Sequence, residues 1–188
     1  MSIRFSRPSV ADLAVLAASA AFHSVTYAPV GLSSSGVVPA GYRLDRWSIE
    51  LGQDDGLFDR ASEALRGWQV HRGAGLVVAA DAPPALGMTV AMAAPLPIGF
   101  VEVVCRVVAV VDEPGEFKFA YGTLPVHPEQ GEESFTVWRE RDDRVSFEIV
   151  AVSRPRHPLA RACRPIARWL QRSATDRYLA AMRSAVAS

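Results

Sequence analysis

The chain has 188 residues, of which 49% are hydrophobic and 21% are charged, and its formal net charge at pH 7 is zero. This composition excludes a disordered chain, and the length suits one domain with a sizeable core. The absence of net charge argues against general binding to nucleic acid. The charge is nevertheless unevenly distributed. Residues 154–188 contain eight arginines and one acid, so this tail carries +7 and the remainder carries −7.

Two cysteines, Cys105 and Cys163, stand within apolar patterns. Their spacing matches neither a metal site nor a disulfide framework. We therefore expect two buried thiols in a reducing cytoplasm, and no metal or other cofactor.

The N-terminal segment is open to two interpretations. Arg4 and Arg7 precede an apolar run, as in a short signal peptide. Ser9 and Asp12 instead form a capping-box pattern, which opens a helix. We expect residues 1–26 to be an N-terminal helical extension or a targeting segment, before one domain at 27–188. No run reaches the roughly 20 apolar residues of a membrane-spanning helix.

The periodicity of apolar residues predicts the elements in chain order. Residues 9–22 form a short Ala-rich helix, and 28–41 form a Pro-, Gly- and Ser-rich loop. A second helix follows, with an apolar face made of Leu57, Phe58, Ala61, Ala64, Leu65 and Trp68. Alternating patterns predict strands at 42–51, 75–80, 88–94, 101–111, 117–123, 132–139 and 145–151.

The strands also indicate which side chains share a face. Phe135 and Val137 lie on one face of their strand. The longest strand places six residues on one face: Val101, Val103, Cys105, Val107, Ala109 and Val111. Glu102 and Arg106 then fall on the other face, where we expect them to be solvated, as we do Glu148.

The terminal segment has the pattern of an amphipathic helix. Its apolar stripe consists of Leu159, Cys163, Ile166 and Leu170, and its basic stripe of Arg161, Arg164, Arg168 and Arg172. Pro165 either opens the main helix or kinks it.

Six consecutive strands joined by short turns predict an antiparallel meander. We therefore expect an α+β fold in which a curved sheet of about six to seven strands grips the long C-terminal helix. This helix-grip order of elements resembles the Bet v 1-like superfamily, which includes START and polyketide-cyclase-like domains. The chain departs from the larger members in having one clear helix, not two, between the first two strands.

Short motifs throughout the chain resemble the bacterial and plant family called domain of unknown function 1990. They span residues 27 to 183, and the block from Tyr121 to Glu133 is the most specific. The matching pieces are Tyr27–Gly31, Pro39–Tyr42, Phe58 with the helix up to Trp68, Tyr121–Pro125, His127–Glu129, Gly131–Glu133, Ser153–Pro155 and Leu159–Arg161. The resemblance implies a fold and no reaction.

Several side chains are candidates for a ligand site. A cavity between sheet and terminal helix would be lined by residues on strand and helix ends, and we assign ligand binding to Tyr42, Tyr121, Glu148, Arg154 and Trp169. The small residues Ala91, Ala93, Ala120 and Gly122 leave room for such a cavity. No residue is assigned a catalytic role.

The acidic hairpin loop offers a second constellation. His127, Glu129, Glu132 and Glu133 crowd one loop and the strand start that follows it. They would either perform acid–base work or form a solvated loop, and their spacing does not support a metal. We expect Arg154 to form an ion pair with Glu132 or Glu133.

Three functions remain open from the sequence. The first is a binding module for an apolar or amphipathic small molecule, which suits a helix-grip cavity. The second is a domain that contacts a protein or an anionic membrane surface through the Arg-rich helix. The third is an enzyme of cyclase or hydrolase type with Glu148 and Tyr121 in the cavity. Nucleic acid is not expected as a partner, and the sequence leaves the oligomeric state open.

Overall fold

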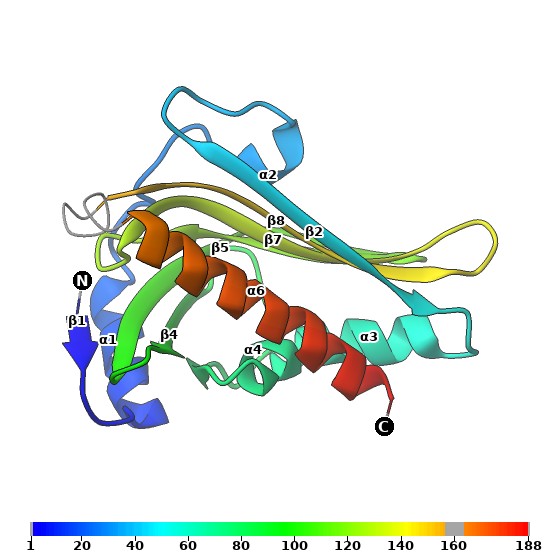
Figure 1. Cartoon of the computed structure of the whole chain (residues 1–188), viewed down its shortest axis with the longest axis horizontal. Coiled ribbons are helices and arrows are strands. Elements are labelled where there is room, and N and C mark those ends of the chain that lie inside the picture. The colour runs from blue at the N-terminus through cyan, green and yellow to red at the C-terminus, as the bar shows by residue number, and fades with distance from the viewer. Residues whose placement is uncertain (1, 157–163, 188) are drawn as a thin grey trace.

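An antiparallel sheet curves around the C-terminal helix in the computed structural model (Figure 1). The structure describes residues 2–156 and 164–187, and the side chains of residues 3–156 and 172–187. The helices are α1 (Val10–Ala20), α2 (Leu32–Ser35), α3 (Leu57–Arg66), α4 (Gln69–Gly73) and α6 (Arg164–Val186). The strands are β1 (Ser2–Arg4), β2 (Arg43–Gly52), β3 (Val77–Ala79), β4 (Thr89–Pro95), β5 (Phe100–Glu113), β6 (Glu116–Thr123), β7 (Glu129–Arg139) and β8 (Val145–Pro155).

The sheet has the strand order β2-β8-β7-β6-β5-β4-β3, and every pairing is antiparallel. The predicted helix-grip fold is therefore confirmed. The sequence did not predict β1, which pairs with the start of β5 at Phe100–Glu102, beyond the end of β6. The predicted N-terminal helix is present as α1, and its Ser9–Asp12 capping box is formed.

Two helices stand between β2 and β3, where the sequence predicted one. The chain leaves α3 at Gly67, and Trp68 takes a left-handed backbone conformation with φ of 56°. Trp68 is buried, and its indole N–H donates to the carbonyl of Ala82 at 3.0 Å. Burial of the ring compensates for the strained backbone, which redirects the chain into α4.

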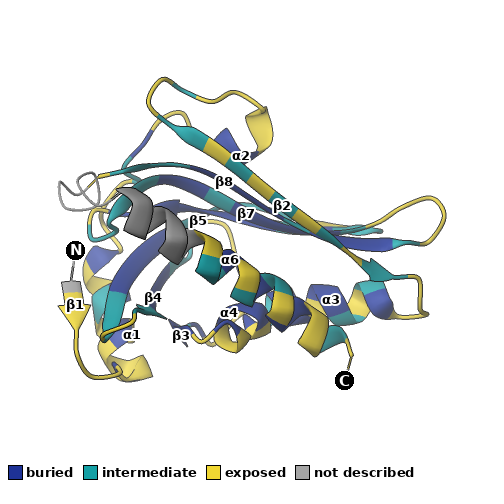
Figure 2. Cartoon of the chain, viewed as in Figure 1, coloured by how far each residue is buried: buried dark blue, intermediate teal, exposed yellow. Residues whose placement is uncertain are grey.

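The main core lies on the concave face of the sheet. Strand alternation points Phe117, Phe119 and Tyr121 of β6 and Phe135 and Val137 of β7 to this face. Helices α3, α4 and α6 cover them (Figure 1), and Figure 2 shows the buried strand residues beneath these helices.

The prediction of which β5 residues point to the core is correct only for the first part of the strand. The pairing register shifts between Val107 and Ala109, so one extra residue is inserted there. After this bulge Val110, opposite Phe119, packs against the core in place of Ala109 and Val111. The bulge cannot be read from the segment Val107–Val111, because it consists of valines and one alanine and is apolar at every position.

The convex face carries a second, smaller core. Leu13, Ala17 and Ala20 of α1 pack against Ala91 and Ala93 of β4. The small residues of the strands thus make room for α1 on the outside of the sheet. The sequence assigned them to an internal cavity, and that assignment is wrong.

A buried glutamate fastens the loop before β2 to the convex face. Glu132 of β7 accepts hydrogen bonds from the Tyr27 hydroxyl (2.6 Å), the Gly31 amide (2.8 Å), and the Ser33 amide (3.0 Å) and hydroxyl (2.5 Å). Gly122 lies beneath the Tyr27 ring, where an added Cβ would stand 2.5 Å from the hydroxyl oxygen. Burial alone would raise the pKa of Glu132, but the four donors outweigh it and hold the pKa below its usual value.

The terminal helix begins at Arg164 with Pro165 in its first turn, which supports the interpretation that Pro165 opens the helix. Its described side chains present Tyr178 and Met182 to the core. The side chains of the predicted apolar stripe, Leu159, Cys163, Ile166 and Leu170, lie outside the described residues, as do those of Arg161, Arg164 and Arg168.

We expect Glu132→Ala to lower the free energy of unfolding by about 3 kcal/mol, because four donors lose a buried acceptor. Urea denaturation measures the change. Glu148→Ala is the matched control, since Glu148 forms a solvent-facing pair with Arg46 and its loss should cost less than about 1 kcal/mol. Equal effects of the two substitutions would contradict this account of the loop.

Candidate ligand-binding site

Adjacent glutamates of β7 face opposite sides of the sheet. Glu132 points to the convex face, and Glu133 points to the concave face with Phe135 and Val137. Glu133 is only half-buried, although it lies on the face that carries the core. An acid in this position distinguishes the concave face from an ordinary apolar core.

Glu133 has one hydrogen-bond donor among the described residues. The Tyr121 hydroxyl donates to its Oε2 at 2.8 Å. On the other side of Tyr121, the same hydroxyl lies 3.5 Å from Nε2 of His71 on α4. A short chain of polar groups therefore runs from α4 through β6 to the carboxylate on β7.

No cation among the described residues compensates the charge of Glu133. Burial raises the pKa of this carboxyl to about 7, against the lowering effect of the Tyr121 hydrogen bond, and the charge of Glu129 raises it further. Burial and the negative charge of Glu133 also raise the pKa values of Tyr121, Tyr178 and Cys105. These neighbours stay neutral at pH 7, so Glu133 is the group of this cluster that titrates near neutrality.

His71 is fully buried and uncharged. Burial lowers its pKa to about 3, and the charge of Arg72 adds to this effect. Its ring contacts those of Trp68, Phe119, Tyr121, Phe135 and Tyr178, with centroids 4.7–6.0 Å away. Its Nδ1 has no hydrogen-bond partner within residues 3–156 and 172–187. Because Tyr121 donates to the carboxylate, an N–H at Nε2 would donate to Tyr121 and leave Nδ1 as the unpaired acceptor.

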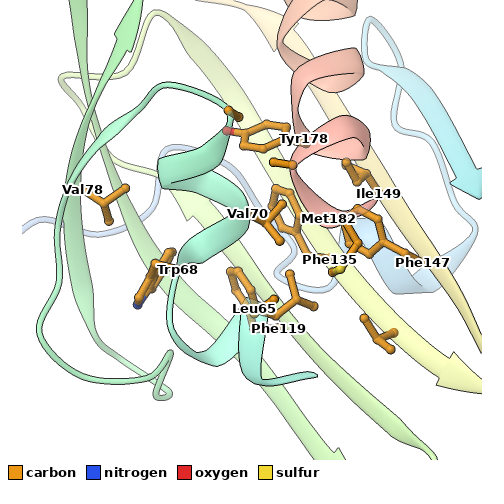
Figure 3. Packing of buried hydrophobic residues seen from close by; sticks show 14 of the residues in the cluster. Leu65, Trp68, Val70, Val78, Phe119, Phe135, Phe147, Ile149, Tyr178 and Met182 are labelled. Atoms are coloured by element: carbon orange, nitrogen blue, oxygen red, sulfur yellow. The ribbon is translucent and has the colours of Figure 1, made fainter. Parts of the chain in front are cut away.

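Aromatic side chains form the wall around this cluster. Figure 3 shows Phe119, Phe135 and Tyr178 gathered where α4 and α6 meet the sheet. Phe119 and Phe135 stack with centroids 5.3 Å apart, and Tyr178 meets Phe135 edge-on at 5.3 Å. This end of the concave face is thus closely packed.

Small residues adjoin Glu133 on its other side. Ala151 of β8 is its cross-strand neighbour opposite Tyr121, and Gly131 precedes it by two residues on the same face. A Cβ on Gly131 would lie 2.1 Å from the carbonyl oxygen of Val152, so this position admits only glycine. Further out on the concave face, the apolar residues Trp47, Ala94 and Val101 remain partly exposed.

Arg154 and Tyr42, two of the predicted ligand-binding residues, contact each other on the convex face. The Arg154 guanidinium lies 4.7 Å from the centre of the Tyr42 ring, and its Nε donates to Gln130 at 3.0 Å. The predicted ion pair of Arg154 with Glu132 or Glu133 is wrong. The β7–β8 register places Arg154 opposite Gln130, and both glutamates have other partners.

The other predicted site residues are also separated. Glu148 pairs with Arg46 at 2.8 Å and lines an open hollow of about 530 Å³ on the convex face. The side chain of Trp169 lies outside the described residues. Tyr121 alone among the predicted residues with described side chains reaches the Glu133 cluster.

Glu102 and Arg106, two strand residues that we expected to be solvated, have protein partners on the convex face. Arg4 of β1 pairs with the buried Glu102 at 2.6 Å. Arg106 donates to Thr89 and to the carbonyls of Ala21 and His23 after α1. Both therefore help to hold the N-terminal segment on the sheet.

The four polar residues predicted to crowd the hairpin loop, His127, Glu129, Glu132 and Glu133, do not form one site. His127 uses Nδ1 to accept the amide of Glu129 at 3.0 Å, and burial lowers its pKa to about 4. Glu129 accepts from Ser153 at 2.9 Å. Among the described residues no three His, Cys, Asp or Glu side chains are placed to hold a metal ion.

Sequence reasoning missed His71 and Tyr178 and assigned Glu133 to the wrong environment. The alternation along β7 carried a signal for Glu133, since it has the same parity as Phe135 and Val137. For His71 the sequence offered only its place after Val70, because the helix break at Trp68 was not predicted.

We expect Glu133→Gln to stabilise the fold at alkaline pH. The folded state keeps a proton on Glu133 up to about pH 7, whereas an unfolded glutamate loses it near pH 4.5, so stability falls as pH rises between these values. The amide still offers an acceptor to Tyr121. Its free energy of unfolding should exceed that of the wild type by about 1–3 kcal/mol at pH 8 and differ little at pH 4.

Urea denaturation at the two pH values measures this difference. Glu148→Gln on the convex face is the matched control and should give the same small change at both. A Glu133→Gln protein that is less stable than the wild type at pH 8 would overturn this description of Glu133.

Comparison with known proteins places the chain within a family of relatives. It is 31% identical over 182 residues to a UPF0548 protein of Deinococcus radiodurans, an alignment that covers 91% of this chain and 92% of the relative. No helix among the described residues is long and apolar enough to cross a membrane.

Solved structures share the fold at low sequence identity. A conserved protein from Geobacillus kaustophilus has a TM-score of 0.55 at 10% identity, covering 77% of this chain and 95% of its own. A hypothetical protein from Helicobacter pylori has a TM-score of 0.54 at 12% identity, and the match covers 76% of this chain and 86% of that protein. Ara h 8.0201 has a TM-score of 0.51 at 10% identity, and the match covers 79% of this chain and 100% of that protein. The model of the domain of unknown function DUF1990 matches residues 26–181, and the chain belongs to this family.

Proposed function

We propose that residues 27–188 form a domain that binds an apolar or amphipathic small molecule between the sheet and α6. Glu133 and Tyr121 contact the polar group of this ligand, and the apolar concave face holds its body. The observation that carries the proposal is Glu133 itself: a half-buried acid on the core side of the sheet, without an ion-pair partner among the described residues.

The destabilising effect of Glu133 on the fold supports a functional role for this residue. A carboxylate held away from water without a counter-charge destabilises a fold, and an apolar residue at the same place would not. Two buried acids elsewhere in this chain have partners that stabilise their charge: Glu132 accepts hydrogen bonds from four donors, and Glu102 pairs with Arg4 at 2.6 Å. Within the described part of the chain, Tyr121 alone donates to the side chain of Glu133. A residue that weakens the fold in this way is typical of a binding or catalytic site.

The space for a ligand body is proposed next to Glu133, on the side away from His71. Ala151 and Gly131 are small, and Trp47, Ala94 and Val101 are partly exposed on the concave face. Apolar residues that remain partly exposed inside a curved sheet suit an apolar ligand, because its binding would remove their surface from water.

Acid–base catalysis in the same site is a second candidate. It is favoured by the pKa of Glu133 near 7, since a general base works best at a pKa close to the operating pH. Tyr121 would hold the carboxylate in position. Conversion of a co-purified molecule by the wild type, and not by Glu133→Gln, would distinguish catalysis from binding alone.

Contact through the Arg-rich helix receives less support. Arg177 donates to the carbonyl of Ala74 at 3.0 Å and so fastens α6 to the end of α4. Arg172 and Arg183 are exposed, and so is the acid Asp176 between them. Among the described side chains of α6, two exposed arginines and one exposed acid do not make a strongly basic surface.

We expect the wild type to bind the uncharged fluorescent probe N-phenyl-1-naphthylamine with one site per chain. Ala151→Phe should weaken binding by about tenfold or more, because the ring fills the space beside Glu133. Ala14→Phe, on the exposed side of α1, is the size-matched control and should bind normally.

Native mass spectrometry of the purified protein should also find a co-purified small molecule in the wild type and lose it in Ala151→Phe. Circular dichroism checks that both variants fold. If the wild type binds no apolar probe and carries no small molecule, the proposed function is wrong.

A further inference from the structure

We propose that the ligand carries a basic nitrogen, and that the Glu133 carboxylate is its counter-ion inside the protein. This inference rests on the proposed function and adds the chemical class of the ligand. Arg154, the one cation among the predicted ligand-binding residues, does not contribute to this site, since it contacts Tyr42 and Gln130 on the convex face.

The hydrogen bonds of Glu133 leave one oxygen for a ligand. Tyr121 donates to Oε2 at 2.8 Å. The described residues supply no donor to Oε1, and the residue keeps part of its surface accessible. An ammonium group has donors to offer and no acceptor, so it complements a carboxylate with one free oxygen.

The charged and titratable groups around Glu133 favour a cation. Among the described side chains, the groups that contact Glu133 or interact with it are neutral or negative: Tyr121 on β6, Cys105 on β5, Glu129 on β7, Tyr178 on α6 and, behind Tyr121, His71 on α4. Two described cations lie beyond this group, since Arg177 acts on Tyr178 and Arg72 acts on His71. Across the sheet, Ala151 separates Glu133 from Asp45, which is already paired with Arg43. An anionic ligand would meet repulsion here, and a cationic ligand would neutralise the site.

The aromatic wall adds to this preference. Tyr121 packs against Phe119 and Phe135, and Tyr178 meets Phe135 edge-on. Aromatic rings attract a desolvated cation, and Tyr121 is the ring of this cluster that binds the Glu133 carboxylate directly. A ligand with a neutral hydroxyl group could donate a hydrogen bond to Oε1 of Glu133, but it would not be attracted by a charge of its own.

Three probes with the same twelve-carbon chain separate these possibilities: dodecyltrimethylammonium, dodecanol and dodecanoate, each used below its micelle concentration. The trimethylammonium group keeps its charge at every pH and has no N–H donor, so it tests the attraction between the charges apart from a hydrogen bond to Oε1. Binding is measured by displacement of N-phenyl-1-naphthylamine from the wild type, from Glu133→Gln, and from Glu148→Gln as the matched control on the convex face.

The wild type should prefer dodecyltrimethylammonium over dodecanol and dodecanoate at pH 8. Because the cation binds the carboxylate and not the carboxylic acid, its affinity should fall by about tenfold or more between pH 8 and pH 5. Glu133→Gln should lose both the preference and the pH dependence and still bind dodecanol, whereas Glu148→Gln should behave as the wild type.

Two results would overturn the inference while leaving the proposed function in place. One is equal affinity of the wild type for the cation and for dodecanol, unchanged in Glu133→Gln. The other is tighter binding of dodecanoate than of the cation. If none of the three probes displaces the fluorophore, or the fluorophore itself does not bind, the proposed function fails with the inference.

Discussion

The alternation of side chains along β7 forces Glu132 and Glu133 to opposite faces of one sheet. No rotation of the strand can give both acids the same environment, because a one-residue change of register would exchange their faces and move Phe135 out of the core. The two acids therefore have separate tasks. Glu132 collects four donors and fastens the loop before β2, while Glu133 stands on the core side with one donor.

The loop fastened by Glu132 and the site around Glu133 stand back to back. Tyr27 lies over Gly122 on the convex face, and Tyr121, the residue before Gly122 in β6, binds Glu133 on the concave face. The block from Tyr121 to Glu133 thus supplies both sides of the sheet. Its convex half explains why glycine stands beside Tyr121, and its concave half places Glu133 beside Tyr121 of the core.

The sequence was sufficient for the architecture, because alternation and helical spacing are local signals repeated over many residues. It failed where one residue changes the course of the chain. The left-handed backbone at Trp68 divides the predicted helix, and the bulge after Val107 exchanges the faces of β5. Neither can be recognised from spacing alone, since both depend on packing against distant residues.

The candidate site was less accessible to sequence reasoning for a related reason. Charge and composition grouped Glu133 with His127 at a polar loop and strand start, whereas strand pairing extends β7 back to Glu129 and makes Glu133 a core-facing residue. Arg154 was expected to pair with Glu132 or Glu133 because the strand order places the hairpin beside the last strand, but the register gives it Gln130. His71 enters the site only because α4 exists. Tertiary pairing, and not composition, decides which polar groups meet.

The central claim is that Glu133 is a carboxyl group kept on the core side without a counter-charge from the side chains that the structure describes. Its pKa can be measured directly by following the side-chain carboxyl carbon of Glu133 by NMR as pH is varied, with Glu133→Gln for assignment. The account predicts a midpoint near 7 for the free protein and a fall of the midpoint when dodecyltrimethylammonium is added. A midpoint at or below the ordinary glutamate value of about 4.3 would contradict it.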